Sequence, residues 1–349
     1  MTAWGIARRP VTAALLVSCC LALGLGACSS SDDSDGSDAA PTTGAPTTTA
    51  TGAGGTFSVL SYNVAGLPAE VSKEDPARHL PLVSPKLDAF DVVLTQEDFD
   101  WWKPGGLAAG LDFVHYHERL RADTTQQHQT AAHPGYEAVD LAADRVADLQ
   151  IGDGLGVLSR FAIEGNTRVP WTACFGGIDT SDGGAADCLA MKGFLLTELT
   201  LADGSVVDLY DLHGEAGGSE RDQALQADDF EQLAAYIGTH SKGHAVILGG
   251  DTNLHTDPPG PDAHEDSADG QDLEIWTTFL AATGLTDSCA ATSCDGPGRI
   301  DKIAYRSGAG VDLEATAHQF HGDTFVDDAG DPLSDHEPLE VTFRWAPAA

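Results

Sequence analysis

Polar and ionisable side chains recur in this chain next to short apolar runs. They lie in six places: Tyr62-Asn63, Gln96-Glu97, Asp211-Leu212-His213, Gly250-Asp251-Thr252-Asn253, Arg299-Ile300-Asp301 and Ser334-Asp335-His336. Carboxylate and amide oxygens are the ligands that Mg²⁺ prefers, and a histidine oriented by a carboxylate is a base near neutral pH. This combination suits hydrolysis of a phosphodiester, in which a hard cation offsets the charge of the phosphate.

Each residue type suggests a role in that chemistry. Glu97 and Asp335 are candidate carboxylate ligands for Mg²⁺, and Asn63 is a candidate neutral oxygen ligand. Mn²⁺ and Ca²⁺ are the alternative cations. His336, oriented by Asp301, is the candidate base that takes a proton from water.

Three further residues are candidates for handling the phosphate and the attacking water. His213 and Asn253 are expected to direct donors at the phosphate oxygens as charge develops there. Asp251 is expected to orient the water.

The scaffold for these residues must bring several strand ends together. Short apolar runs bounded by Gly, Pro or Asp predict strands at Phe57–Val64, Asp91–Thr95, Gly156–Ser159, Phe194–Leu199, Val206–Leu212, Ala245–Leu248, Ile300–Tyr305 and Leu339–Trp345. Apolar residues at helical spacing predict helices over Arg221–His240 and Asp272–Thr283. Strands mixed with helices predict an α/β domain, in which sites gather at strand ends. The stretch 103–150 is left unassigned.

The motifs resemble, in order, those of the endonuclease/exonuclease/phosphatase superfamily over about residues 56–345. They are Leu60-Ser61-Tyr62-Asn63-Val64, Gln96-Glu97, Leu158-Ser159-Arg160, His213, Gly250-Asp251-Thr252-Asn253, Ile300-Asp301 and Ser334-Asp335-His336. The segments Asn63-Val64-Ala65-Gly66-Leu67-Pro68 and Met191-Lys192-Gly193-Phe194 are most similar to the neutral sphingomyelinase branch. The resemblance implies a four-layer sandwich of two packed mixed β-sheets flanked by helices.

The resemblance also implies roles for individual residues. The metal-binding Glu of the family falls on Glu97, with Asn63 beside it, and its phosphate-contacting His falls on His213. Its Asp-x-Asn pair falls on Asp251 and Asn253. Its His-orienting Asp falls on Asp301, and its terminal Asp-His pair falls on Asp335 and His336. The chain departs from the family pattern at Asp211-Leu212-His213, where the family commonly has Asn-x-Thr-His, and at Thr252, where an aromatic residue is usual. Ala65 stands where abasic-site nucleases of this fold carry a second acid, which disfavours that branch.

The first residues predict export. Residues 1–27 contain Arg8, Arg9 and then an apolar run too short to span a membrane, which is typical of a signal peptide. The run ends at Leu25-Gly26-Ala27-Cys28, which is similar to a bacterial lipobox and predicts lipidation of Cys28. An ordinary secretory signal is the alternative. Residues 28–55 lack large apolar side chains and are expected to be a disordered tether, and 56–346 to be the catalytic domain. The expected location is extracellular, with the lipid anchor in the outer face of the bacterial cell membrane.

The net charge of the chain disfavours nucleic acid as a binding partner. The net charge of −36 repels nucleic acid and weighs against a basic nucleic-acid groove.

The chain has seven Cys, and four of them remain once the signal peptide and the lipid anchor are set aside: Cys174, Cys188, Cys289 and Cys294. Three pairings are open; the local ones, Cys174–Cys188 and Cys289–Cys294, are preferred, and a zinc site is the rival.

The leading functional hypothesis is therefore a metal-dependent phosphodiesterase, expected to be a monomer, that acts on a membrane phospholipid such as sphingomyelin. An extracellular DNase-like nuclease of the same fold is the first alternative. A non-catalytic, lipid-anchored binding protein is the second.

Overall fold

The computed structural model describes residues 54–348, apart from 71, 178–183, 258–270 and 295. The expected signal peptide at 1–27, the lipidation site Cys28 and all of the expected tether except residues 54 and 55 lie outside the described residues. Among the helices of the described part of the chain, none is both long and apolar enough to cross a membrane.

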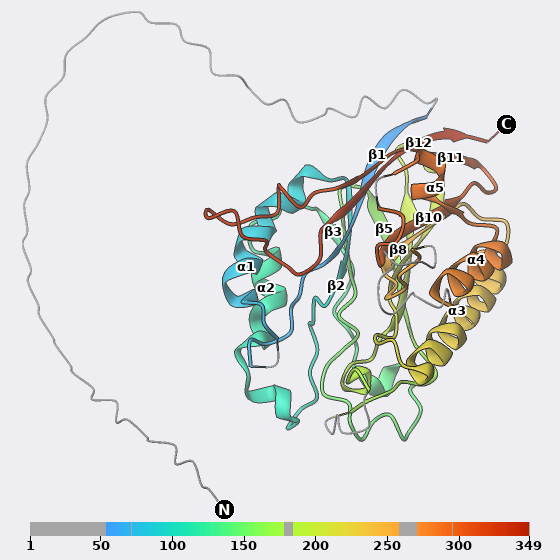
Figure 1. The fold of residues 1–349 in the computed structure, drawn as a ribbon. Coiled ribbons are helices and arrows are strands. Elements are labelled where there is room, and N and C mark those ends of the chain that lie inside the picture. Colours follow the sequence, from blue (N-terminus) through green and yellow to red (C-terminus); the bar gives the residue numbers. More distant parts are fainter. Residues whose placement is uncertain (1–53, 71, 178–183, 258–270, 295, 349) are drawn as a thin grey trace, which may run out of the picture. The chain divides into compact units, whose positions relative to one another are not determined.

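Two mixed six-stranded sheets pack against each other (Figure 1). The first has the order β11 (Val311–Phe320), β12 (Leu339–Pro347), β1 (Gly55–Asn63), β2 (Val92–Gln96), β4 (Gly156–Ser159) and β3 (His128–Gln129). The second has the order β5 (Ala162–Pro170), β6 (Gly193–Thr200), β7 (Val206–His213), β8 (Val246–Asp251), β10 (Asp301–Arg306) and β9 (Thr286–Asp287). The pairs β1–β2 and β7–β8 are parallel, and the other pairs are antiparallel.

Helices cover the outer face of each sheet, so the expected four-layer sandwich is confirmed (Figure 1). The first sheet is covered by α1 (Pro76–Val83), the 3₁₀ helix η1 (Ser84–Ala89) and α2 (Tyr116–Arg121). The second is covered by α3 (Glu220–His240) and α4 (Gln271–Thr283).

Alternation along each strand separates the inner core from the outer ones. In β1, Phe57 and Val59 join the core between the sheets, whereas Leu60 and Tyr62 pack toward α1 and η1. The strand has a period of two, so each of its faces buries its own apolar set. The same parity directs Asn63, the last residue of β1, into the layer between the sheets.

Two of the longer strands, β5 and β11, were not predicted, and neither were the two-residue strands β3 and β9. Most side chains of β5 are exposed or half-buried, and its pairing with β6 is interrupted between Glu164 and Thr167. In β11 the register shifts between Ala315 and Ala317, which breaks the apolar alternation. Both strands lie at a sheet edge, where one side of the strand has no neighbour and the apolar signal is weak.

The stretch 103–150, which the sequence left unassigned, folds mainly into short elements. They are the 3₁₀ helices η2 (Leu107–Gly110), η3 (Asp112–His115) and η4 (Tyr136–Ala138), together with α2 and β3. Short elements of this kind give no sustained periodicity in a sequence.

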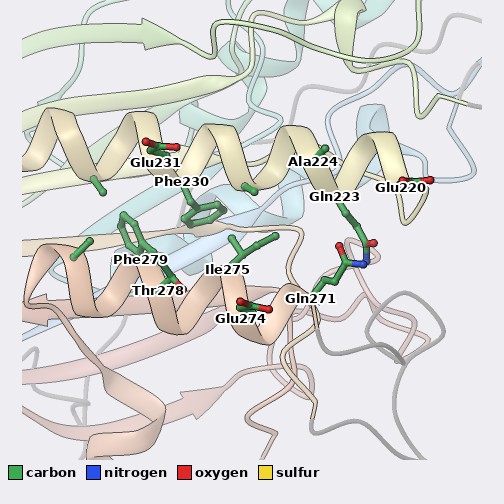
Figure 2. Close-up of a pocket in the computed structure, with 13 residues that line it drawn as sticks. Glu220, Gln223, Ala224, Phe230, Glu231, Gln271, Glu274, Ile275, Thr278 and Phe279 are labelled. Atoms are coloured by element: carbon green, nitrogen blue, oxygen red, sulfur yellow. The ribbon is translucent and has the colours of Figure 1, made fainter.

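Helix α3 begins at a capping box, in which the Ser219 side chain accepts from Asp222 N and the Asp222 side chain accepts from Ser219 N. Its apolar side meets α4, where the Phe230 and Phe279 rings make an edge-on contact with centroids 5.1 Å apart. Figure 2 shows the groove between the two helices, with Glu231 and Glu274 at its edges.

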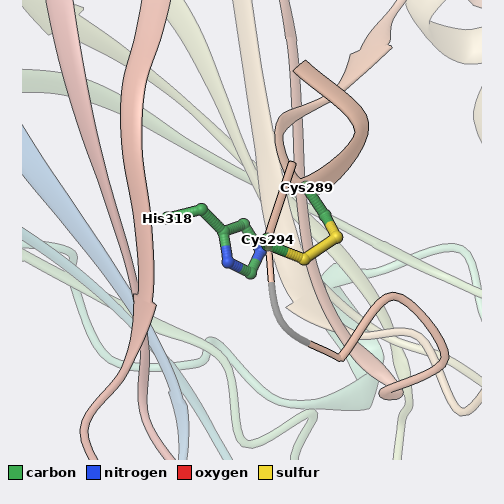
Figure 3. A group of neighbouring side chains, drawn as sticks. All are labelled: Cys289, Cys294 and His318. Carbon is green, nitrogen blue, oxygen red and sulfur yellow. A yellow bond between two sulfur atoms is a disulfide. The ribbon is translucent and has the colours of Figure 1, made fainter. Parts of the chain in front are cut away.

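Both disulfide bonds have the local pairing that the sequence analysis preferred. Cys174 is bonded to Cys188, and Cys289 is bonded to Cys294. The second bond closes α5 (Ser288–Thr292) next to His318 of β11 (Figure 3). Since the sulfur atoms are bonded to one another, they do not form the zinc site that was the rival interpretation.

Candidate active site

The sheet registers align the predicted residues at one end of the sandwich. Asn63 of β1 pairs with Gln96 of β2, and Glu97 follows directly. In the other sheet, Asp251 pairs with both His213 of β7 and Asp301 of β10. Five segments that are distant in the sequence therefore meet at the end of the layer between the sheets.

Asn63 joins the two sheets. Its Nδ2 donates to Asp251 Oδ2 at 3.0 Å and to Glu97 Oε1 at 3.2 Å. Its Oδ1 accepts from Ala65 N at 3.0 Å, and Ser334 Oγ donates to its backbone oxygen at 2.8 Å. One buried amide thus holds carboxylates from opposite sheets a few ångströms apart.

Glu97 has an unusual backbone conformation. Its φ of 55° lies in the left-handed region, which residues with a Cβ rarely adopt and which often marks functional sites. The segment after β1 passes directly over it, because a Cβ at Gly66 would lie 2.0 Å from the Glu97 carbonyl oxygen. Glu97 is half-buried.

Asp251 is the buried centre of the cluster. Its Oδ2 is 3.3 Å from His213 Nε2, and its Oδ1 accepts from Asn253 N at 3.0 Å. Burial alone would raise the pKa of Asp251, but the imidazoles of His336 and His213 hold it well below the usual range. Asn253 also has a left-handed φ of 52°, and its Nδ2 donates to Gly214 O.

His336 and Asp301 form a hydrogen-bonded pair. His336 Nδ1 donates to Asp301 Oδ2 at 2.8 Å, and His336 Nε2 lies 3.7 Å from Asp251 Oδ2. Burial alone would lower the pKa of His336, but Asp301 and Asp251 raise it to about 10. Burial raises the pKa of Asp301 despite the neighbouring imidazole. The pair fixes the ring orientation and the tautomer of His336.

Asp335 is more exposed than the other residues of the cluster. Its side chain is exposed, and Ser334 Oγ lies 3.5 Å from its carboxylate oxygen Oδ1. Ser334 also donates to the backbone oxygen of Asn63 and accepts from His336 N. Asp335 is therefore connected to the cluster through its neighbour Ser334.

The donor types fit a hard divalent cation. The Glu97 carboxylate is an oxygen ligand of the kind that Mg²⁺ and Ca²⁺ take, and Asn63 would offer its Oδ1, which accepts from Ala65 N in this structure. Single ligand atoms of Asp251, Asp301 and His336 lie within 4.8 Å of one another. Within the described residues, Asp301 Oδ1 and His213 Nδ1 are buried without a hydrogen-bond partner.

Sequence reasoning missed a second group of buried charges behind His213. Lys192 Nζ is 2.5 Å from Asp187 Oδ1 and donates to Gly214 O at 3.1 Å. Burial raises the pKa of nearby Glu215 to about 8, with a further contribution from Asp187. The segment Met191-Lys192-Gly193-Phe194 had drawn attention to Lys192 only as a motif. The signal in the sequence was a Lys next to a buried apolar strand, because a buried Lys is costly unless an acidic side chain pairs with it.

The comparisons with known proteins agree with this architecture. A family model described as the Endonuclease/Exonuclease/phosphatase family matches residues 60–336. A relative named sphingomyelinase from Mycobacterium tuberculosis (strain ATCC 25618 / H37Rv) is 30% identical over 308 residues, covering 83% of this chain and 53% of that protein. The chain spans about half the length of the curated relatives it matches.

Solved structures share the fold. Sphingomyelinase C from Streptomyces griseocarneus has a TM-score of 0.54 and 19% identity, and the match covers 82% of this chain and 99% of the other. A Staphylococcus aureus beta toxin variant with bound magnesium ions has a TM-score of 0.54 and 15% identity, with 82% and 98% covered. With its two packed sheets, its converging strand ends and the family match, the chain belongs to the endonuclease/exonuclease/phosphatase family.

Proposed function

We propose that this domain is a divalent-metal-dependent phosphodiesterase that uses Mg²⁺, and that its substrate is a membrane phospholipid such as sphingomyelin. One observation carries the reaction class: Asn63 bridges Glu97 and Asp251 beside the Asp301–His336 pair. The substrate class rests on the relatives named sphingomyelinase at 30% identity and on the branch-like motifs around Asn63 and Lys192.

The proposed mechanism assigns one task to each part of the cluster. Glu97 and Asn63 would hold the cation, which would supply positive charge beside the phosphate oxygens and would oppose the carboxylates that keep His336 protonated. Asp301 holds the His336 ring so that Nε2 faces the site and takes a proton from water. Asp251 lies close enough to the same Nε2 to orient that water.

The remaining polar groups stabilise the charge that develops on phosphorus-bound oxygens. His213 Nε2 already faces Asp251, so its N–H points into the cluster. The Asn253 amide now donates to Gly214 O and turns toward the phosphate when substrate is bound. Preorganised donors of this kind lower the barrier because the protein does not have to reorganise around the new charge.

The same proposal covers location and assembly. Residues 1–27 act as a lipoprotein signal, Cys28 carries the lipid, and the enzyme works outside the cell as a monomer at the membrane surface. The apolar run before Cys28 and the polar residues after it support this assignment. Radiolabelled palmitate incorporation tests it: Cys28→Ser removes the label if Cys28 is lipidated, and an unchanged label contradicts the assignment.

Phosphocholine release from sphingomyelin vesicles tests the activity. Release is expected with Mg²⁺, is abolished by EDTA, and falls by at least about a hundredfold in Glu97→Gln. A parallel plasmid-nicking assay separates the nuclease alternative. Release that is independent of divalent cations, or nicking without lipid hydrolysis, overturns the proposal.

A further inference from the structure

The residues on either side of Glu97 are anchored in opposite directions. Gln96 points into the layer between the sheets, and Asp98 points to the outer face of the first sheet. Glu97 itself has the left-handed φ of 55°. A residue with a Cβ keeps this conformation only where the surrounding contacts impose it.

The inner anchor ties Glu97 to the opposite sheet. Gln96 Nε2 donates to Asp211 Oδ1 at 2.6 Å, and Gly156 N donates to Asp211 Oδ2 at 3.2 Å. Asp211 belongs to β7, two residues before His213, whereas Gln96 and Gly156 belong to the first sheet. All of these atoms are buried, so the link fixes the separation of the two sheets directly beneath the cluster.

The outer anchor ties Glu97 to helix α2. The Asp98 carboxylate is 2.6 Å from Arg121 Nη1 and 2.8 Å from His117 Nδ1, and it accepts from Thr95 Oγ1 at 3.0 Å. The Asp98 side chain is fully buried and that of Arg121 is 12% exposed. Asp98 N donates to Gly154 O at 2.9 Å, which holds the backbone of the same residue.

We propose that Asp211 and the Asp98–Arg121 pair form a clamp on Glu97 that presets its carboxylate for the divalent cation. The clamp consists of positioning residues, because none of them touches Asn63, Asp251 or His336 through a contact among the described residues. This inference rests on the proposed function, since it assigns to Glu97 the role of metal ligand.

The clamp has a specific consequence for metal affinity. If one anchor is released, residue 97 relaxes toward an extended backbone and its carboxylate turns away from Asn63. Part of the binding free energy of the cation is then used to restore the conformation of residue 97, so the metal affinity falls. Partners that orient metal ligands typically contribute about 10- to 100-fold in affinity.

Mn²⁺ binding to the purified catalytic domain provides the test, measured by calorimetry and by electron paramagnetic resonance. The relevant binding component is the one that Glu97→Gln removes. Arg121→Met is expected to weaken this component by about tenfold or more. The isosteric Asp211→Asn replaces an acceptor with a donor that faces Gln96 or Gly156, and it is expected to weaken the same component. If the Arg121→Met variant does not fold, the Mn²⁺ affinity of Asp211→Asn alone tests the clamp.

Arg306→Met is the matched control. Arg306 donates to the carbonyl oxygens of Ser241, Thr283 and His244 and lies at the end of β10 opposite Asp301. Its loss lowers stability without touching the clamp, so Mn²⁺ affinity is expected to stay at the wild-type value. Equal weakening in Arg306→Met and Arg121→Met overturns the clamp, because the effect then follows stability alone.

The remaining outcomes separate this inference from the proposed function. If Glu97→Gln binds Mn²⁺ as the wild type does, the metal role of Glu97 fails, and the clamp fails with it. If Glu97→Gln loses the component but Arg121→Met and Asp211→Asn retain wild-type affinity, only the clamp is overturned.

Discussion

The two ends of the layer between the sheets are built from the same strands and differ in chemistry. At one end, Phe343 packs against Phe57 and Tyr305, with ring centroids 5.7 Å and 5.2 Å apart. At the other end, Asn63 and Asp301 continue the inner faces of β1 and β10. The apolar end buries surface and stabilises the fold, whereas the polar end gathers groups that are costly to bury.

This contrast explains how one period-two pattern serves both purposes. Along β10, Tyr305 and Ile303 join the apolar core and Asp301 enters the cluster, all on the same face. One face of a single strand therefore supplies core residues at one end and a site residue at the other. Substitutions at the two ends are expected to separate activity from stability.

The largest effect is expected for His336→Ala. Loss of a general base lowers kcat about a thousandfold or more. Steady-state kinetics on a soluble phosphodiester with saturating Mg²⁺ measure the change. A kcat within tenfold of the wild type would remove His336 from the chemistry.

Phe343→Ala should do the reverse at the apolar end. The truncated ring leaves a cavity in a fully buried site, so the free energy of unfolding falls by about 3–5 kcal/mol. Urea titration measures the loss, and kcat per folded molecule should stay at the wild-type value. A large loss of kcat in the folded fraction would show that the two ends are not separable.

The pH dependence of stability sharpens the same contrast. The pKa of His336 is raised to about 10 in the folded domain, above the ordinary value of about 6.5 for an unfolded chain. Its stabilising contribution is therefore complete below about pH 6.5 and is lost as the pH rises through about 10. The stability advantage of metal-free wild type over His336→Gln should shrink across that window in urea titrations. An advantage that grows with pH contradicts the charge assigned to this ring.

The smallest effect is expected at the short disulfide. Replacing Cys289 and Cys294 by Ser opens a loop with a sequence separation of 5 residues, which should cost about 2 kcal/mol of stability. The bond lies beside His318 of β11, and among the described residues no hydrogen bond or ion pair joins either cysteine to Asp301 or His336, so kcat should not change. Thermal unfolding and kinetics of the double variant check both statements.

The sequence was most informative where apolar runs and polar ends follow one another on central strands. Asn63, Asp251 and Asp301 were predicted as site residues because each adjoins a buried strand, and the sheet registers bring them together. Asp335 was predicted from its motif, but exposure of its side chain depends on the path of a loop that no local pattern reports.

Long-range pairing explains most of what the sequence did not predict. Asp98 and Arg121 are 23 positions apart, and Gln96 and Asp211 are separated by 115. Nothing in the spacing of such residues indicates that they meet. The edge strand β5 was not predicted for a different reason: its side chains are mostly polar and half-exposed, so its sequence shows little of the apolar alternation that indicates a strand.

A crystal structure of the catalytic domain soaked in Mn²⁺, with anomalous diffraction recorded for the metal, tests the central claim most directly. We expect an anomalous peak about 2 Å from a Glu97 carboxylate oxygen, within the cluster formed by Asn63 and Asp251. An ordered Mn²⁺ elsewhere and none beside Glu97 would contradict a metal-dependent phosphodiesterase site at this end of the sandwich.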